Sequence, residues 1–377
     1  MELYIGENIK RLRREKGITQ ETLADFMHVS AAAVSKWERG ETFPDISMVI
    51  PLASYFGVST DEILGVCNAK NEETIQKYLN ESDRLNALGK SKERFDLIVK
   101  AYSEFPNDWR IVEAYLWQLN YDPNHWEEPY GFEVHKEELY RLCDRVLNEC
   151  SVDKTRYAAL SIIGGLYLAD GKKEKAIETA KRFPDYWTTE GEELEGCYDS
   201  DNGEYAEWIA QLRKNIEDIA YLFVHKLIKA TLHAKDIDTW GQLQCFQKAV
   251  SFLKLIYDED DYGFYNQEMS SLYLWIANRY VMLNDFEHAF ENYRLGFRYA
   301  KAYDDLPNLK THTSFFVRGN VLDRAKTGST SEDNMVKMQI DRLRAWEIYE
   351  AVKDTPEMKA LLREYEPFAG KKVDCWG

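Results

Sequence analysis

Apolar residues recur every three or four positions along the first 65 residues, and this period predicts a series of short amphipathic helices. In the first helix the apolar positions Ile5, Ile9 and Leu12 share one face, and Gly17 marks the end. Polar residues occupy the opposite face, so each helix is expected to bury one side only. By the same criterion we expect helices over residues 5–16, 20–27, 30–40, 45–56 and 60–64.

The second and third of these helices are joined by a short turn. Thr19 can cap the second helix by accepting a backbone N–H, and Ser30 can cap the third in the same way. His28, Val29 and the cap Ser30 lie between them, so the order is helix, three-residue turn, helix. This spacing is typical of the helix-turn-helix unit, whose second helix enters the major groove of DNA.

The third helix, about three turns long and ending at Gly40, has two distinct faces. Ala33, Val34 and Trp37 form an apolar stripe that we expect to face the core. The outward face is small, polar and cationic, and it comprises Ala31, Ala32, Ser35 and Lys36.

A net charge of −17 is unusual for a DNA-binding protein, so we considered how the charge is distributed. Residues 1–66 hold seven basic and ten acidic side chains, a net charge of −3, while the rest of the chain carries −14. Five of the seven basic residues lie between Lys10 and Lys16. We expect this cluster, rather than the total charge, to contact phosphates.

The N-terminal region resembles the Cro/CI-type helix-turn-helix domain of phage repressors and bacterial regulators. The resemblance extends over about residues 5–66 and implies a five-helix domain that binds double-stranded DNA. It is carried by the run Ile9 to Ala24 (IKRLRREKGITQETLA), by Val34 to Gly40 (VSKWERG), by Pro44, and by residues 52–53, 56–59 and 61–64.

The resemblance also implies roles for single residues. Gln20 matches the glutamine with which the family engages a phosphate, at a helix N-terminus whose dipole favours anions. Arg13 and Glu38 match a pair that joins the first helix to the recognition helix, and Trp37 matches a core position.

The family's base-reading positions are occupied here by small side chains. An alanine methyl offers only an apolar contact, whereas Lys36 can donate to guanine or to phosphate, so specificity rests on Lys36, Ser35 and the shape of the DNA. The residues expected to contact DNA are Gln20, Ser30, Ala31, Ala32, Ser35 and Lys36, with phosphate contacts from Thr19, Arg11, Arg14 and Thr42.

Beyond a polar stretch at residues 67–73, which we interpret as a linker, the pattern is almost entirely helical. Two windows agree position for position, with a bend at Gly171 in one and at Asn284 in the other. They resemble the tetratricopeptide repeat, a helical hairpin that stacks into a right-handed superhelix. The first window is Leu160, Ile163, Gly164, Tyr167, Ala176, Ala180 and Phe183, and the second is Tyr273, Ile276, Ala277, Tyr280, Ala289, Tyr293 and Gly296.

The sequence thus predicts an all-α protein with two domains. These are a helix-turn-helix domain over residues 1–66 and a tetratricopeptide-like repeat domain over residues 74–377. Within the repeat domain, residues 109–129 and 188–203 are expected to be irregular, because the first is aromatic and broken by an Asp-Pro pair and the second is acidic.

Several classes of protein are disfavoured. No run of about 18 uncharged apolar residues and no signal-peptide pattern is visible, so we expect a cytoplasmic protein without a membrane partner. Six cysteines form no C-x-x-C pair and the seven histidines form no ligand pattern, so we expect no metal and no cofactor. The P-loop, the G-x-S-x-G element and the dinucleotide fingerprint are missing, so we expect no enzyme.

A Cro/CI-type domain followed by tetratricopeptide-like helices resembles the peptide-sensing transcription regulators of Gram-positive bacteria. This implies a homodimer whose repeat domain binds a short signalling peptide. In the second repeat window, Asn278 is a candidate for holding the peptide backbone, and an ordinary hydrogen bond between helices is the alternative. The rival hypothesis is a repeat domain that serves as a protein-binding scaffold without a small ligand.

Overall fold

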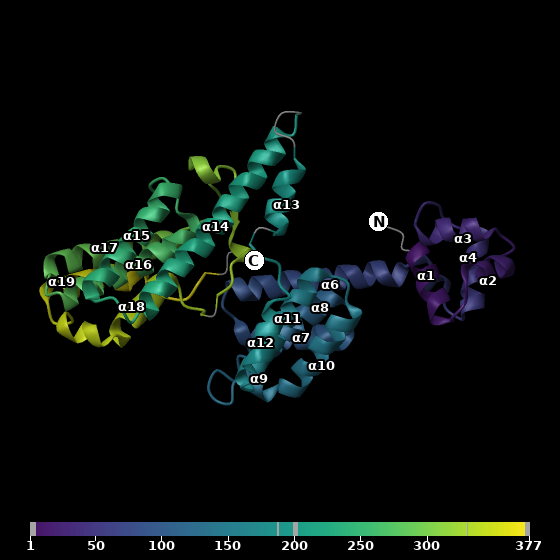
Figure 1. Ribbon diagram of the computed structural model, residues 1–377, viewed down its shortest axis with the longest axis horizontal. Coiled ribbons are helices and arrows are strands. Elements are labelled where there is room, and N and C mark those ends of the chain that lie inside the picture. The colour runs from purple at the N-terminus through teal and green to yellow at the C-terminus, as the bar shows by residue number, and fades with distance from the viewer. Residues whose placement is uncertain (1–4, 187, 199–202, 330, 374–377) are drawn as a thin grey trace. The chain divides into compact units, whose positions relative to one another are not determined.

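The computed structural model describes residues 5–186, 188–198, 203–329 and 331–373, with backbone only for residues 66–70. Almost all regular structure in this part of the chain is helical, so the all-α prediction is confirmed (Figure 1). Every helix in it is too short or too polar to cross a membrane. The chain divides into two compact units, one made of Met1–Glu81 with Ile98–Ile111 and the other of Ser82–Leu97 with Val112–Gly377.

Five short helices form the N-terminal head, and their bounds match the prediction to within one or two residues. Thr19 and Ser30 cap their helices as expected, because their hydroxyl oxygens accept the backbone N–H of Thr22 and Ala33. The helices are α1 (Ile5–Glu15), α2 (Gln20–Met27), α3 (Ala31–Glu38), α4 (Ile46–Phe56) and α5 (Thr60–Leu64).

The third helix is one turn shorter than expected because its C-terminal cap begins at Arg39. Gly40 adopts a left-handed φ of 73° and its N–H donates to the Trp37 carbonyl, while the Glu41 N–H donates to the Lys36 carbonyl. These two bonds define a Schellman motif, which ends a helix where a glycine permits positive φ.

The core of the head holds the apolar positions that the sequence pattern assigned to it. Ile9, Leu23 and Val34 are fully buried, and Trp37 is nearly so. At Gly6 a β-carbon would lie 1.9 Å from the Trp37 carbonyl oxygen, so α1 and α3 approach too closely for any other residue at that position. The packing of α1 against α3 therefore depends on this glycine.

The stretch 67–73, which we interpreted as a linker, lies inside a helix. Helix α6 runs without a break over Val66–Ala87. The sequence pattern missed this helix because its N-terminal part is polar. A weakly amphipathic helix lacks the apolar period from which helices were predicted. The domain borders at residues 66 and 74 remain a prediction.

Both predicted repeat windows form helical hairpins. The first consists of α11 (Asp153–Ala169) and α12 (Lys173–Ala180), and the second of α16 (Asn266–Met282) and α17 (Phe286–Asp304). The bends match as well, because Gly171 and Asn284 have left-handed φ values of 71° and 60°. At Gly296 an added β-carbon would lie 2.7 Å from Leu274 Cδ2, so this small residue allows the two helices of the second hairpin to pack closely.

The expectation of irregular structure at residues 109–129 is wrong over its first half. Helix α8 spans Trp109–Asn120, and Val112 and Leu116 are fully buried one turn apart. Aromatic side chains on both faces obscured the helical period in the sequence. The second irregular stretch contains α13 (Glu190–Cys197), and its residues 199–202 lie outside the described part.

The remaining elements surround these hairpins. The helices are α7 (Ser91–Glu104), α9 (Gly131–Val134), α10 (Lys136–Glu149), α14 (Tyr205–His233), α15 (Thr239–Ile256), α18 (Met335–Ala345) and α19 (Pro356–Tyr365). Short 3-10 helices are η1 (Gly263–Tyr265), η2 (Phe315–Val317), η3 (Arg324–Lys326), η4 (Glu347–Ala351) and η5 (Glu366–Phe368).

One antiparallel β-hairpin interrupts the helical order. Strand β1 (Leu309–Thr311) pairs with β2 (Val321–Asp323), with Lys310 opposite Leu322. Strands of three residues are too short to show a period of two in the sequence, which is why the pattern did not reveal them.

Candidate nucleic-acid interface and ligand cavity

Helix α3 is fixed to α1 by a buried ion pair. Arg13 donates from Nε to Glu38 Oε1 at 2.6 Å and from Nη2 to Oε2 at 2.9 Å. Glu38 is 6% exposed, and Arg13 also donates to the Ile18 carbonyl at 2.9 Å. This bidentate geometry sets the position of α3 relative to α1, which is the structural role implied for these two residues.

Gln20 belongs to the same network. Its Nε2 donates to Glu38 Oε2 at 2.7 Å, so α2 is tied to α3 as well. Burial acts to raise the pKa of Glu38, but the hydrogen bonds from Arg13 and Gln20 outweigh it and lower the pKa below its usual value. The phosphate contact expected of Gln20 thus competes with a bond inside the head.

The outward face of α3 is smaller than the sequence suggested. Ala32 and Lys36 are exposed, whereas Ala31 is half-buried against the core of the head. The Ser30 hydroxyl is engaged as the helix cap, and so is that of Thr19 at the start of α2. Among the expected base-reading positions of α3, Ala32 and Lys36 are exposed, and Ala31 and Ser35 are half-buried.

Arg39 adds a second cation at this face, and the sequence reading overlooked it. Its Nη1 donates to the Ser35 hydroxyl, one turn earlier on α3. Its Nε also donates to Glu41 at 2.6 Å, and both partners are about half exposed. The spacing of four residues between Ser35 and Arg39 was the available signal, because such pairs meet on a helix surface.

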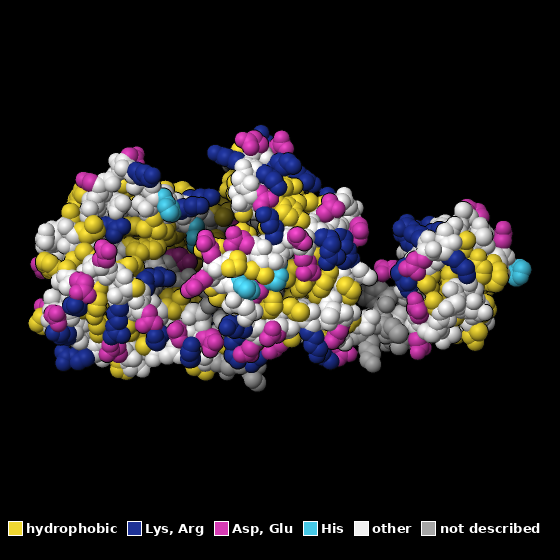
Figure 2. Space-filling view, turned by 90° about the horizontal axis from the view of Figure 1, so that it is seen from below, with side chains coloured by type: hydrophobic (Ala, Val, Ile, Leu, Met, Phe, Trp, Pro, Cys, Tyr) yellow, Lys and Arg dark blue, Asp and Glu magenta, His cyan; other side chains and the backbone are white. Residues whose placement is uncertain are grey.

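The basic cluster of α1 is partly used within the head. Arg11 is 2.9 Å from Glu62 and 3.1 Å from Glu15, and the Lys16 ammonium lies 4.4 Å from the centre of the Tyr55 ring. Lys10, Arg14 and Thr42 are exposed. Figure 2 shows dark-blue and magenta side chains next to one another on the visible face of the head, which lies at the right of the picture. Phosphate contact by Arg11, Arg14, Thr19 and Thr42 remains a prediction.

Asn278 lies inside the second hairpin. It is 5% exposed, and its Oδ1 accepts a hydrogen bond from the Tyr293 hydroxyl at 2.6 Å. Tyr293 is fully buried on the facing helix α17. The geometry favours the hydrogen bond between helices over the peptide contact.

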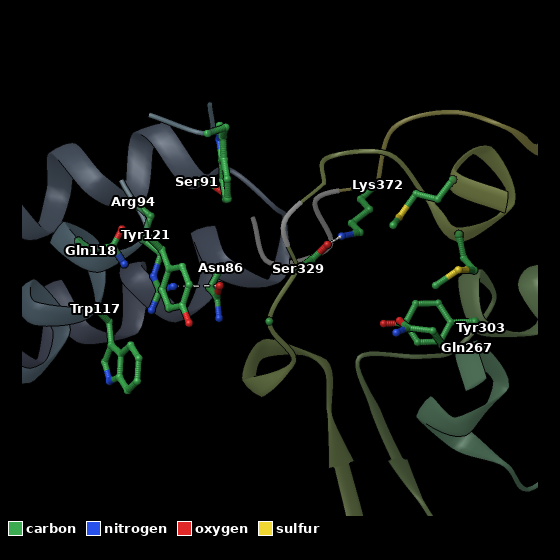
Figure 3. A pocket seen from close by; sticks show the side chains of 14 residues that line it. Asn86, Ser91, Arg94, Trp117, Gln118, Tyr121, Gln267, Tyr303, Ser329 and Lys372 are labelled. Atoms are coloured by element: carbon green, nitrogen blue, oxygen red, sulfur yellow. Dashed lines mark hydrogen bonds between the residues drawn. The ribbon is translucent and has the colours of Figure 1, made fainter. Parts of the chain in front are cut away.

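A cavity of about 680 Å³ lies in the second unit, away from Asn278. Figure 3 shows Arg94, Trp117, Gln118 and Tyr121 on one side and Gln267, Tyr303 and Lys372 on the other. Trp117 and Tyr121 are stacked, with ring centres 6.0 Å apart. Amide side chains and aromatic rings therefore share one cavity.

Two cations line this cavity. Arg94 donates to Ser82 and Asn86, each at 3.0 Å, and burial lowers its pKa. Lys372 donates to the Ser331 carbonyl at 2.7 Å, and burial lowers its pKa to about 8. The hydrogen-bond partners of both cations in the described structure are thus neutral oxygen atoms.

Comparisons with known proteins agree with the geometry of the head. The helix-turn-helix family model matches residues 9–63. The SPbeta prophage-derived uncharacterized HTH-type transcriptional regulator YonR of Bacillus subtilis (strain 168) is 33% identical over 82 residues, which cover 22% of this chain and 74% of YonR. The HTH-type transcriptional activator BcrR of Enterococcus faecalis is 32% identical over 84 residues, 21% of this chain and 41% of BcrR.

The solved structures match this chain more weakly. Bacillus thuringiensis PlcR in complex with the peptide PapR7 and DNA aligns with 79% of this chain and 96% of its own length, at 17% identity and a TM-score of 0.29. A TM-score this low does not establish a shared fold. The family-model match, by contrast, lies within the residues of helices α1–α5. Through this head, the chain belongs to the helix-turn-helix family of transcriptional regulators.

Proposed function

We propose that this chain is a sequence-specific DNA-binding regulator whose helical domain dimerises and binds a short regulatory peptide. The observation that carries the DNA-binding part is the position of α3. The Arg13–Glu38 pair and the close approach at Gly6 hold this helix firmly, while Ala32 and Lys36 remain exposed on it. A rigid helix with a small, cationic outward face suits the major groove.

The chemistry of this face limits how it reads DNA. Lys36 can donate to the O6 and N7 atoms of guanine or to a phosphate, and Arg39 can do the same once it leaves Glu41. Ala32 offers only a methyl group for contact with thymine. Sequence recognition is therefore carried by few hydrogen bonds and depends on dimerisation and DNA shape.

The cavity of the second unit supports the peptide hypothesis. Its volume of about 680 Å³ falls in the range of ligand sites. Asn86, Gln118 and Gln267 can pair with a peptide backbone, and the rings of Trp117 and Tyr121 can cover apolar side chains. Arg94 and Lys372 suit a carboxylate of the same ligand.

Binding of a peptide would regulate the protein by changing the populations of two arrangements of the dimer. In this mechanism the dimer has two arrangements, which differ in the spacing of the heads. The peptide must bind one arrangement more tightly than the other, because a ligand with equal affinity for both does not change their equilibrium. A cytoplasmic location and a double-stranded DNA partner follow from the same proposal.

Selection of DNA from a random pool by the full chain tests the DNA-binding part. The expected result is two similar half-sites about one helical turn apart, which a symmetric dimer requires. A single half-site would contradict the dimer, and the lack of any enriched sequence would contradict sequence-specific binding.

Capture of peptides tests the second part. The purified chain is incubated with the low-molecular-weight fraction of a culture of the source organism, and retained peptides are identified by mass spectrometry. Tyr121→Ala removes an exposed ring of the cavity, and Tyr205→Ala removes a similarly exposed ring on α14 outside it. A peptide retained by wild type and Tyr205→Ala but lost with Tyr121→Ala supports the proposal.

The scaffold hypothesis makes the opposite prediction. Here the low-molecular-weight fraction yields no peptide, and a stable protein partner is recovered from cell extract instead. That outcome would overturn the peptide part and leave the DNA-binding part intact.

A further inference from the structure

A buried histidine joins three segments of the second unit. His312 follows strand β1, and its side chain is fully buried. Its Nε2 lies 3.2 Å from Glu217 Oε1 on α14, and its Nδ1 lies 3.3 Å from Asp261 Oδ1 in the segment before η1. The β-hairpin, α14 and the segment 258–262 therefore meet at one imidazole ring.

This geometry requires the charged form of the ring. A neutral imidazole has one N–H, so one of its two nitrogens would direct a lone pair at a carboxylate oxygen. Neither contact of His312 has the alignment of a hydrogen bond, so the attraction rests on opposite charge. An imidazolium offers its positive charge to both carboxylates at once.

In the described part of the chain, the ion pairs of these two carboxylates involve one cation besides His312. Lys310 on β1 lies 3.4 Å from Asp261 Oδ1, and the Tyr257 ring lies 5.2 Å from the imidazole, between centres. Tyr257 donates to Glu217 Oε1 at 3.4 Å, and Tyr265 of η1 donates to the Glu217 carbonyl at 3.1 Å. Two carboxylates thus face one lysine and one histidine, and loss of the histidine proton leaves a buried net negative charge.

The same two carboxylates hold the hairpin in place. Asp261 Oδ2 accepts from the backbone N–H groups of Thr313 and Ser314, at 2.9 and 2.7 Å. Glu217 Oε2 accepts from the side-chain amide of Asn320 at 2.7 Å. Repulsion between unbalanced carboxylates would therefore be transmitted to the hairpin directly.

We propose that His312 is a pH-sensitive latch, which in its protonated form fastens residues 309–323 to α14 and to residues 258–262 and which loosens when it loses its proton. The latch does not depend on any ligand.

The sign of the pH effect follows from the surroundings of the ring. Burial acts to lower the pKa of His312, but Glu217 and Asp261 outweigh it and raise the pKa above its usual value of 6.5. A group whose pKa is higher in the folded state stabilises that state at low pH. The contribution is complete below pH 6.5 and is lost as the pH rises through the raised pKa.

The latch borders a second cavity of about 420 Å³. Glu217 and Leu322 line this cavity together with Lys326, Thr327 and Gly328, which follow β2. Opening of the hairpin would therefore remove part of the cavity wall. The latch gives this wall a dependence on pH.

Hydrogen exchange and histidine titration on the full chain test the proposal. Protection factors of the amides of residues 310–322, corrected for the intrinsic exchange rate, are measured from pH 6 to pH 9. In parallel, NMR of the chain with isotope-labelled histidine follows the titration of each ring. We expect His312 to titrate above pH 6.5 and the protection factors to fall through that step by up to about tenfold per pH unit, the limit for one proton.

Two variants and one control separate the latch from general effects of pH. His312→Gln should abolish the fall of the protection factors with rising pH. Glu217→Gln should move this step to lower pH, and it replaces His312→Gln if that variant does not fold. His288→Gln replaces an exposed histidine paired with Asp285 on α17 and should leave the step unchanged. A His312 ring that titrates below pH 6.5, a wild-type hairpin whose protection does not change with pH, or a step that survives His312→Gln would each overturn the latch.

Discussion

Two buried carboxylate networks hold short elements in place, one in the head and one in the second unit. In the head, Glu38 joins α3 to α1 through Arg13. In the second unit, Glu217 and Asp261 join the β-hairpin to its surroundings through His312. Glu38 and Asp261 are buried, and the Glu217 side chain is 18% exposed, so the carboxylates of both networks need a matching positive charge.

The networks differ in the group that supplies this charge. A guanidinium stays protonated at any physiological pH, and its planar fork makes two aligned bonds to Glu38. An imidazolium loses its proton near neutrality, and the contacts of His312 are longer and poorly aligned. The head is thus built to keep one geometry, whereas the hairpin is held by a group that can be switched off.

Removing the carboxylate of the head network should have the largest effect. Glu38→Ala leaves Arg13 without its counter-charge, and we expect a loss of about 3–5 kcal/mol, enough to unfold the head. Thermal unfolding followed by circular dichroism measures this. Glu41→Ala, which removes an exposed carboxylate next to Arg39, is the control and should leave the unfolding temperature nearly unchanged. Equal losses would show that burial of the pair is not what matters.

Changing the exposed face of α3 should affect DNA binding and leave stability unchanged, because the network acts on the other face. For Lys36→Ala we expect a loss of about 1–3 kcal/mol in affinity for a selected site, or a salt slope reduced by about one. Fluorescence anisotropy at several salt concentrations measures both. Lys254→Ala on α15 is the control. Unchanged affinity and an unchanged salt slope would show that Lys36 does not contact DNA.

Replacing the Arg13 guanidinium by another cation should have a smaller effect on stability. Arg13→Lys retains a cation near Glu38 and loses the bidentate geometry, so we expect about 1 kcal/mol of destabilisation. Arg11→Lys, at an exposed cation paired with Glu15 and Glu62, should be close to neutral in the same thermal measurement. If the two variants behave alike, the geometry of the Arg13 pair contributes nothing beyond its charge.

Lowering the pH from 7 to 5 should have the smallest effect. The pKa of Glu38 is lowered by folding, so its contribution is present above the unfolded value of 4.5 and is lost only as the pH falls through the folded value. The change at pH 5 should stay below about 0.5 kcal/mol. The stabilisation by protonated His312 does not decrease as the pH falls, because its pKa is raised by folding. Neither network should therefore open at pH 5. Chemical denaturation at pH 5 and pH 7 measures the difference, and a large loss at pH 5 would contradict both assignments.

Much of the fold could be predicted because its signals are local. The bounds of α2 and α5 follow from a capping hydroxyl, an apolar period and a terminating residue, all within a dozen positions. The bends at Gly171 and Asn284 were visible for the same reason. Where the period was weak, as in α6, or masked by aromatic residues, as in α8, the prediction failed.

The candidate DNA interface was predicted less completely than its scaffold. Sequence pattern indicated which face of α3 points outward, but it could not show that Arg11 pairs with Glu62, 51 residues away, or that Gln20 donates to Glu38. Each of these pairings depends on how helices cross. Asn278 is a similar case, because only the facing helix shows that Tyr293 uses its amide oxygen.

The sequence alone determined that the chain is helical, that it begins with a helix-turn-helix head and that it holds two matching hairpins. These properties arise from bonds and contacts between residues three or four positions apart. The pairing of charges, the position of the cavities and the contacts of His312 with Glu217 and Asp261 became visible in the folded chain. The partners of that ring come from segments about 50 and 95 residues earlier, so packing, rather than any local pattern, brings them together.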